Sequence, residues 1–187
     1  IRRERFNHGG TRNRIIRLLN HRGFDAVVFL SQDVELSSPD SLKNLLTFLW
    51  SHDIAGCYGR QIAGDPRSFE AWQRRICYPE QSHINSLESE FPFFFSDAFA
   101  AWKVKEVLRC GNFPVCKFGE DTLLASQIIC GGGRTGYCAE AVVRHEHPET
   151  VLSLFRRGFE VGELHGAHPE LRGFHATRVR LPLRLIF

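Results

Sequence analysis

A short apolar run near the start of the chain constrains the fold more than any other feature. Residues 26–30 read Ala-Val-Val-Phe-Leu, between Asp25 and the polar triplet Ser31-Gln32-Asp33. An unbroken apolar run of this length is typical of a strand buried on both faces of a parallel sheet. We therefore predict a central strand at 25–30, with Asp33 at its carboxyl end.

Helical patterns lie on both sides of this run. Apolar residues recur at helical spacing from Thr11 to near Gly23, and again at 42–49, after Pro39 and Asp40. A second short strand is expected at 54–58. Helices that alternate with strands predict an α/β layer architecture, in which ligands bind beyond the carboxyl ends of the strands.

The rest of the chain continues this alternation less regularly. We expect, in chain order, an irregular excursion over the active face at 60–90 with a short helix at 69–76, a strand at 91–96, helices at 98–108 and 120–129, a glycine C-cap at 131–133, a strand pair at 134–143, and a helix at 149–165. The domain is therefore expected at 1–165, with 166–187 as a tail or the start of a further region.

Composition narrows the function classes. The 187 residues are 43% hydrophobic, which suits one core, and the net charge of +3 is spread along the chain, which disfavours nucleic-acid binding. The longest apolar runs are far shorter than the roughly 20 residues that cross a bilayer. Six cysteines without a CxxC pair favour reduced thiols in a cytoplasmic protein. The start at Ile1 and the lack of methionine suggest a fragment of a longer protein.

Two sets of carboxylates are candidates for chemistry. Asp33 could hold a divalent cation that bridges two phosphates, because hard cations prefer oxygen ligands; a turn or capping role before Pro39 is the alternative. Glu120 and Asp121 open a helix, where acidic residues complement the helix dipole. Asp121 could equally take the proton of an acceptor hydroxyl in a sugar transfer.

Histidine, arginine and glycine residues supply further candidates. His145 and His147 would point to the same side of an extended strand and could join Asp33 in a mixed nitrogen and oxygen metal site, or serve as surface structure. A glycine turn that opens a helix, with Gly10, Arg12 and Asn13, could bind phosphates. The pair Arg156 and Arg157 on a later helix could do the same, or form a solvated face of that helix.

Eight short motifs stand in an order that resembles the rhamnosyltransferase-type branch of family 2 glycosyltransferases. They are Phe6-Asn-His-Gly-Gly-Thr-Arg-Asn13, Val28-Phe-Leu-Ser-Gln-Asp33, Tyr58-Gly-Arg-Gln61, Tyr78-Pro79, Phe95-Ser96, Gly119-Glu-Asp121, Ala141-Val-Val-Arg-His-Glu-His147 and Phe155-Arg-Arg-Gly158. The resemblance implies a GT-A-like (Rossmann-like) fold with a mixed sheet flanked by helices. It also implies a nucleotide-diphosphate sugar donor, Mg²⁺ or Mn²⁺, and an inverting single displacement.

The resemblance assigns a role to each matching residue. Asp33 would be the metal carboxylate of a DXD-like position, and His147, with His145, would complete the metal and diphosphate site. Asp121 would be the general base, supported by Glu120. Arg12 and Asn13 would lie near the donor, and the acceptor pocket would be shaped by Phe95, Ser96, Asp97 and Trp102.

Three departures from the family pattern bear on these roles. The family's usual Ser-Asn is Ser96-Asp97 here, and its usual His-Ser-His is His145-Glu146-His147, which changes local charge. The first strands of the family's fold, which bind the nucleobase, have no counterpart before Phe6. Their absence predicts an uncovered sheet edge.

Three functions follow as hypotheses. The first is transfer of a deoxyhexose such as rhamnose from dTDP-rhamnose or a UDP-sugar to a polysaccharide or lipid-linked acceptor. A peripheral contact with the inner face of the membrane is compatible with it. The second is a non-catalytic remnant that binds glycans or a partner protein. The third is a metal hydrolase that uses Asp33, His145 and His147.

Overall fold

The strand predicted from the first apolar run forms, but it lies at the edge of a mixed sheet. The computed structural model describes residues 6–146 and 151–172. Strand β1 (Ala26–Leu30) pairs antiparallel with β5 (Phe99–Lys103), and the sheet order is β1-β5-β3-β6-β2. Within the described residues β1 has no strand on its other side, so the prediction of a central, parallel strand was wrong. The apolar run did not identify the neighbouring strands, and at this edge position only Val27 is buried, while Leu30 is 50% exposed.

The centre of the sheet is β3 (Gly56–Ile62), which lies between β5 and β6 (Thr135–His145). The β3–β6 pair is parallel, and its register shifts between Gly59 and Arg60. A side chain at Gly59 would meet the Ala141 carbonyl oxygen at 2.5 Å, so only glycine fits this close approach. Two short strands, β2 (Val34–Leu36) and β4 (His83–Asn85), pair antiparallel with β6.

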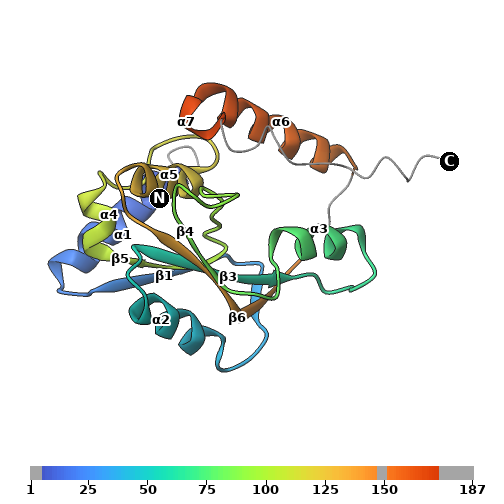
Figure 1. Cartoon of the computed structure of the whole chain (residues 1–187), viewed down its shortest axis with the longest axis horizontal. Helices are drawn as coiled ribbons and strands as arrows, with labels where there is room; N and C mark the ends of the chain where they lie inside the picture. Colours follow the sequence, from blue (N-terminus) through green and yellow to red (C-terminus); the bar gives the residue numbers. More distant parts are fainter. Residues whose placement is uncertain (1–5, 147–150, 173–187) are drawn as a thin grey trace.

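Helices cover both faces of this sheet (Figure 1). Helix α2 (Ser41–Ser51) covers one face through Leu45 and Leu49. The other face is covered by α1 (His8–His21), α4 (Val104–Arg109) and α5 (Glu120–Cys130). Helix α3 (Phe69–Cys77) lies in the excursion after β3, while α6 (Val151–Ala167) and α7 (Pro169–Arg172) lie over α5.

Three segments differ from the sequence-based expectation. Residues 91–96 form turns and irregular backbone instead of a strand, because Pro92 cannot donate a ladder hydrogen bond. The strand is β5, where a helix was expected; its alanines favour a helix locally, but pairing with β1 and β3 on both sides prevails. The strand pair predicted at 134–143 is the single long strand β6.

The remaining helices and the cysteines agree with the sequence. Helices form at 8–21, 41–51, 69–77, 120–130 and 151–167, and Gly132 with a φ of 82° ends the fourth of them. All six cysteines have free thiols. No helix among the described residues has both the length and the apolar character needed to cross a membrane.

Candidate active site

A cavity of about 710 Å³ opens between the start of α1 and the end of β1. It brings together residues that are far apart in the sequence: Arg12 on α1, Asp33 after β1, and Asp97 before β5. Its lining consists of Phe6, His8, Thr11, Arg12, Ile15, Phe29, Leu30, Ser31, Gln32, Asp33 and Asp97. The cavity is therefore bordered by a cation and by two carboxylates from separate elements.

Two of the lining residues, Arg12 and Asp97, belong to what we call the acidic cluster, made up of Arg12, Asp97, Glu120 and Asp121. The Arg12 Nε lies 3.1 Å from Asp97 Oδ2, and its Nη1 donates to Glu120 Oε1. The guanidinium also lies over the ring of Phe29, 5.3 Å from its centroid. A charged group held on two carboxylates and an aromatic face has a fixed position, so Arg12 presents its charge at one place in the cavity.

Asp97 is almost completely buried, with 2% of its surface exposed. Its Oδ1 accepts a hydrogen bond of 2.7 Å from Trp102 Nε1. Burial is the main cause that raises the pKa of Asp97 to about 7; the charge of Arg12 opposes this rise, and the charge of Asp121 adds to it. The departure from the family's Asn at this position thus places a group that titrates near neutrality inside the acidic cluster.

Asp121 stands in the first turn of α5, beside Asp97. Its Oδ2 accepts from the backbone N–H of Asp97 at 3.1 Å, and its Oδ1 accepts from the N–H of Thr122 at 2.8 Å. Burial raises the pKa of Asp121, and the neighbouring Glu120 carboxylate adds to the effect. A carboxylate with a raised pKa is a stronger base than an exposed one, so this environment suits proton transfer.

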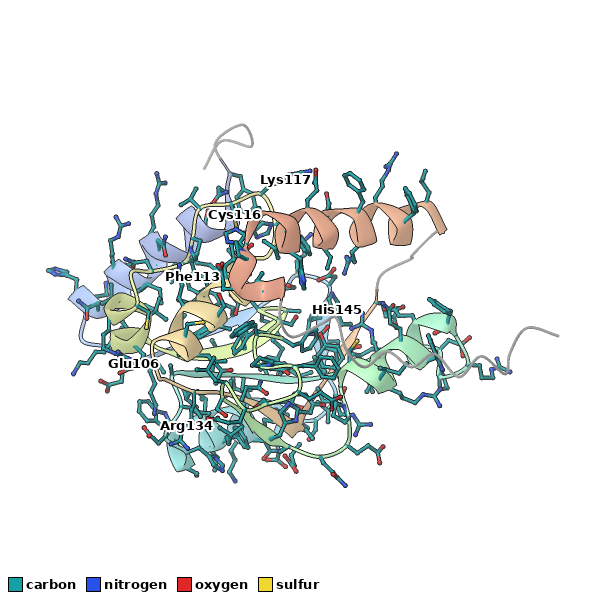
Figure 2. The ribbon with its side chains drawn as sticks, turned by 45° about the horizontal axis from the view of Figure 1, so that its top comes forward. Glu106, Phe113, Cys116, Lys117, Arg134 and His145 are labelled. Atoms are coloured by element: carbon teal, nitrogen blue, oxygen red, sulfur yellow. The ribbon has the colours of Figure 1, made fainter. Side chains whose placement is uncertain are left out.

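Another lining residue, Asp33, lies next to His145. His145 is the last residue of β6 (Figure 2). The short strand β2 pairs Val34 with His145, which brings Asp33 Oδ1 to 3.3 Å from His145 Nε2. His145 is buried and Asp33 is one-third exposed. The pairing of β2 with β6 therefore places a carboxylate and an imidazole side by side at the end of the sheet.

This pair fits a divalent cation that takes its other ligands from a substrate. Carboxylate and imidazole both bind divalent metals, and Mg²⁺ commonly uses one or two protein ligands plus phosphate oxygens. Among the described residues no group of three or more His, Cys, Asp or Glu side chains could hold a metal on its own. His147, the third predicted ligand, lies outside the described residues.

His145 is also held by a buried set of side chains that we call the glutamine network, made up of Gln61, Arg74, Ser96 and His145. Gln61 Oε1 lies 2.7 Å from His145 Nδ1 and accepts from Arg74 Nη1 at 2.7 Å, while its Nε2 donates to Ser96 Oγ at 2.9 Å. Sequence reasoning missed Gln61 and Arg74 as site residues. Only the Tyr58-Gly-Arg-Gln61 motif and the polar character of Gln61 in a buried strand pointed to Gln61.

The comparison with protein families decides the identity. The model of the family described as "Glycosyltransferase like family 2" matches residues 1–159. The chain belongs to family 2 of the glycosyltransferases. The resemblance inferred from the eight motifs is thereby confirmed.

Two curated relatives and one solved structure are similar to this glycosyltransferase. The O-antigen chain rhamnosyltransferases RfbN of Salmonella typhimurium and WbaN of Salmonella anatum are each 33% identical over 171 residues, which cover 88% of this chain and 54% of theirs. The chain thus spans about half the length of these relatives. The mannosyltransferase PcManGT from Pyrobaculum calidifontis, solved in complex with GDP-Man and Mn²⁺, has a TM-score of 0.63 and 18% identity, covering 91% of this chain and 48% of its own. This likeness confirms the predicted GT-A-like fold.

The glycine turn of the glycosyltransferase differs from the predicted anion site. Helix α1 begins at His8, not at Thr11, and the Gly10 N–H donates to the capping side chain of Asn7 at 2.8 Å. The amide of Asn13 exchanges two hydrogen bonds with the backbone of Phe113, at 2.8 and 2.9 Å. Gly10 and Asn13 therefore hold the start of α1 in place, and of this group only Arg12 lines the cavity.

The residues predicted for the acceptor pocket also separate into two groups. Phe95 and Trp102 stack on each other at 4.2 Å in the core and are at most 3% exposed, so their faces are not available to a sugar. Trp102 donates a hydrogen bond to Asp97, while Ser96 belongs to the glutamine network. Arg156 and Arg157 are exposed on α6 and do not line the cavity.

Proposed function

We propose that this glycosyltransferase moves a deoxyhexose, rhamnose, from a nucleotide-diphosphate sugar to a polysaccharide or lipid-linked acceptor. Two curated relatives at 33% identity are named as rhamnosyltransferases of the O-antigen chain, which supports the sugar and the kind of acceptor. The similar mannosyltransferase was solved with GDP-Man and Mn²⁺ bound, which supports a nucleotide-sugar donor and a divalent cation. The donor we propose is dTDP-rhamnose, with a UDP-sugar as the alternative.

The observation that carries the proposal is the shared cavity. Asp33, which lies beside His145, lines it together with Arg12 and Asp97, and Asp121 is hydrogen-bonded to the Asp97 backbone. A sugar transfer needs a cationic place for the diphosphate and a base for the acceptor hydroxyl within one site. Arg12 supplies positive charge in the cavity, and the candidate base Asp121 is hydrogen-bonded to the backbone of Asp97, which lines it.

In the proposed reaction Asp121 takes the proton of the acceptor hydroxyl. The acceptor oxygen forms a bond to the anomeric carbon as the bond from that carbon to the diphosphate oxygen breaks, which inverts the configuration and releases the nucleoside diphosphate. Asp33 and His145 would hold the divalent cation, which supplies positive charge to the departing diphosphate. Glu120 and Asp97 fix Arg12, whose charge lies in the same cavity.

Replacement of Asp121 tests this assignment. The full-length protein that contains this chain is incubated with Mn²⁺, dTDP-rhamnose and a lipid-linked glycan, and released nucleoside diphosphate is measured. Asp121→Asn should lower kcat by about 10²- to 10⁴-fold, because the base is lost while the shape of the side chain is kept. Asp40→Asn is a matched control, since Asp40 also stands at a helix start but is exposed and makes no side-chain capping bond.

Two results would contradict the proposal. Undiminished transfer by Asp121→Asn would show that another group accepts the proton. Wild-type protein that releases no nucleoside diphosphate from dTDP-rhamnose or UDP-sugars, with either Mn²⁺ or Mg²⁺, would reject the transferase activity itself.

A further inference from the structure

Gln61 lies at the meeting point of four separate segments of the chain. It belongs to β3 and is 3% exposed, and its amide contacts His145 at the end of β6, Arg74 on α3 and Ser96 before β5. These partners are 84, 13 and 35 residues away in the sequence. A buried amide with three such partners must have each of its atoms in a defined role.

The donors around Gln61 determine the direction of its amide. A guanidinium has only donors, so the amide atom that faces Arg74 Nη1 at 2.7 Å must be the oxygen. The amide nitrogen then faces Ser96 Oγ at 2.9 Å, which accepts. The opposite orientation would set the amide N–H groups against the donors of Arg74, so Arg74 excludes it.

The orientation of Gln61 in turn determines the proton on His145. Gln61 Oε1 can only accept, and it lies 2.7 Å from His145 Nδ1, so Nδ1 carries a proton. In the neutral imidazole the lone pair is then on Nε2, which faces Asp33 Oδ1 at 3.3 Å. Two acceptors that face each other in this way are arranged for a cation.

Arg74 is itself held firmly, so the chain of contacts extends to α3. Its Nε and Nη2 donate to Glu70 Oε1 at 3.0 and 2.6 Å, and its side chain is 11% exposed. This leaves Nη1 directed at Gln61. Helix α3 lies in the excursion beyond the end of β3 and apart from the layered body of the fold (Figure 1).

We propose that Gln61 is a positioning residue that fixes the ring orientation and the tautomer of His145, and that Arg74 on α3 fixes Gln61. The excursion at 63–90 is thereby joined to the cation-binding pair. This inference rests on the proposed function only for the cation; the tautomer is a property of the protein alone. Removal of the hydrogen-bond partner of a metal-binding histidine typically weakens metal binding about 10- to 100-fold.

The tautomer is measured directly by long-range ¹H–¹⁵N NMR of ¹⁵N-histidine-labelled protein at alkaline pH, where imidazoles are neutral. Wild-type His145 should carry its proton on Nδ1. Gln61→Leu should move the proton to Nε2, where Asp33 accepts it, whereas Gln61→Glu keeps an acceptor oxygen and should keep the wild-type tautomer. Arg74→Leu should give a mixture of the two tautomers, since the amide of Gln61 can then turn.

Mn²⁺ affinity, measured by electron paramagnetic resonance, is the second measurement. Gln61→Leu should bind Mn²⁺ about 10- to 100-fold more weakly and Gln61→Glu should restore binding. Arg75→Leu is the matched control for Arg74→Leu, because Arg75 is exposed on the same helix and donates only to backbone carbonyls of its own segment. Should Gln61→Leu fail to fold, Arg74→Leu against Arg75→Leu carries the test.

A proton on Nε2 in wild-type His145, or a Gln61→Leu protein with unchanged tautomer and unchanged Mn²⁺ affinity, would overturn the inference. Lack of Mn²⁺ binding by the wild type would instead contradict the cation in the proposed function. The NMR result decides the positioning role in that case too, so the two failures are distinguishable.

Discussion

The acidic cluster lines the cavity through Arg12 and Asp97, and the glutamine network contacts the lining residue Asp33 through His145, but different forces hold the side chains of the two groups. In the acidic cluster Asp97 and Glu120 pair with one guanidinium while Asp121 has no ion pair with it, and burial raises the pKa of Asp97 and of Asp121. In the glutamine network a neutral amide divides its donors and acceptors among Arg74, Ser96 and His145. Buried charge without full compensation raises the pKa of a carboxylate and so makes Asp121 a stronger base. A neutral amide whose hydrogen bonds are all satisfied instead fixes the orientation of the ring of His145.

The largest effect on stability is expected from the one cation of the acidic cluster. Arg12→Leu leaves Asp97 and Glu120 buried without their partner, and loss of one member of a buried ion pair costs about 3–5 kcal/mol. Urea denaturation of Arg12→Leu and of Arg14→Leu, an exposed arginine on the same helix, measures the difference.

The destabilisation by Arg12→Leu should depend on pH, because it comes from buried carboxylates that lose their cation. Arg12 lowers the pKa of Asp97, so without Arg12 that pKa rises, and the variant loses more stability as pH rises and the carboxylates ionise. A loss below about 1 kcal/mol at neutral pH would indicate that the ion pair behaves like an exposed one.

The acidic cluster also shows how far the sequence predicted the site. Arg12, Asp33, Glu120, Asp121 and His145 were all assigned through the family resemblance, and the structure places them around or beside one cavity. Their special residue types and short motifs made them recognisable. Their assigned roles stay predictions, because position alone does not show what each group binds.

Gln61 and Arg74 could not be found in the same way. Their partners are separated from them by up to 84 residues, and glutamine has no chemistry that marks it as functional in a sequence. The fold shows the same limit: helical periodicity located α1, α2 and α5, but the edge position of β1 and the strand character of β5 depend on pairing across the sheet.

A smaller, pH-dependent effect should distinguish Asp97 from its neighbours. Its pKa is about 7 in the folded protein and near 3.9 when unfolded, so between these values the folded state keeps a proton that the unfolded state has released. That contribution to stability is complete below about pH 4 and is lost as pH rises to about 7.

In the wild type this titration makes the free energy of unfolding fall as pH rises through this range. Asp97→Asn removes the titrating group, so the slope of that fall should become smaller by on the order of 1 kcal/mol per pH unit. Thermal or urea unfolding at several pH values measures the slope, and Asp53→Asn, an exposed carboxylate, serves as the control. An unchanged slope in Asp97→Asn would show that the titration belongs to another group, of which Asp121 is the first to replace next.

The smallest effect on stability is expected at the cation-binding side of the cavity, where it separates binding from folding most clearly. Asp33 is one-third exposed in the turn after β1, so Asp33→Asn should change the free energy of unfolding by no more than about 0.5 kcal/mol. The same variant should lose most of its Mn²⁺ affinity, because an amide oxygen is a weaker ligand than a carboxylate. For Arg12→Leu we expect the larger effect on the free energy of unfolding and the smaller effect on Mn²⁺ affinity. If Asp33→Asn instead destabilises the fold as strongly as Arg12→Leu, the Asp33–His145 contact is an ion pair that holds β2 against β6, and the cation must be bound elsewhere.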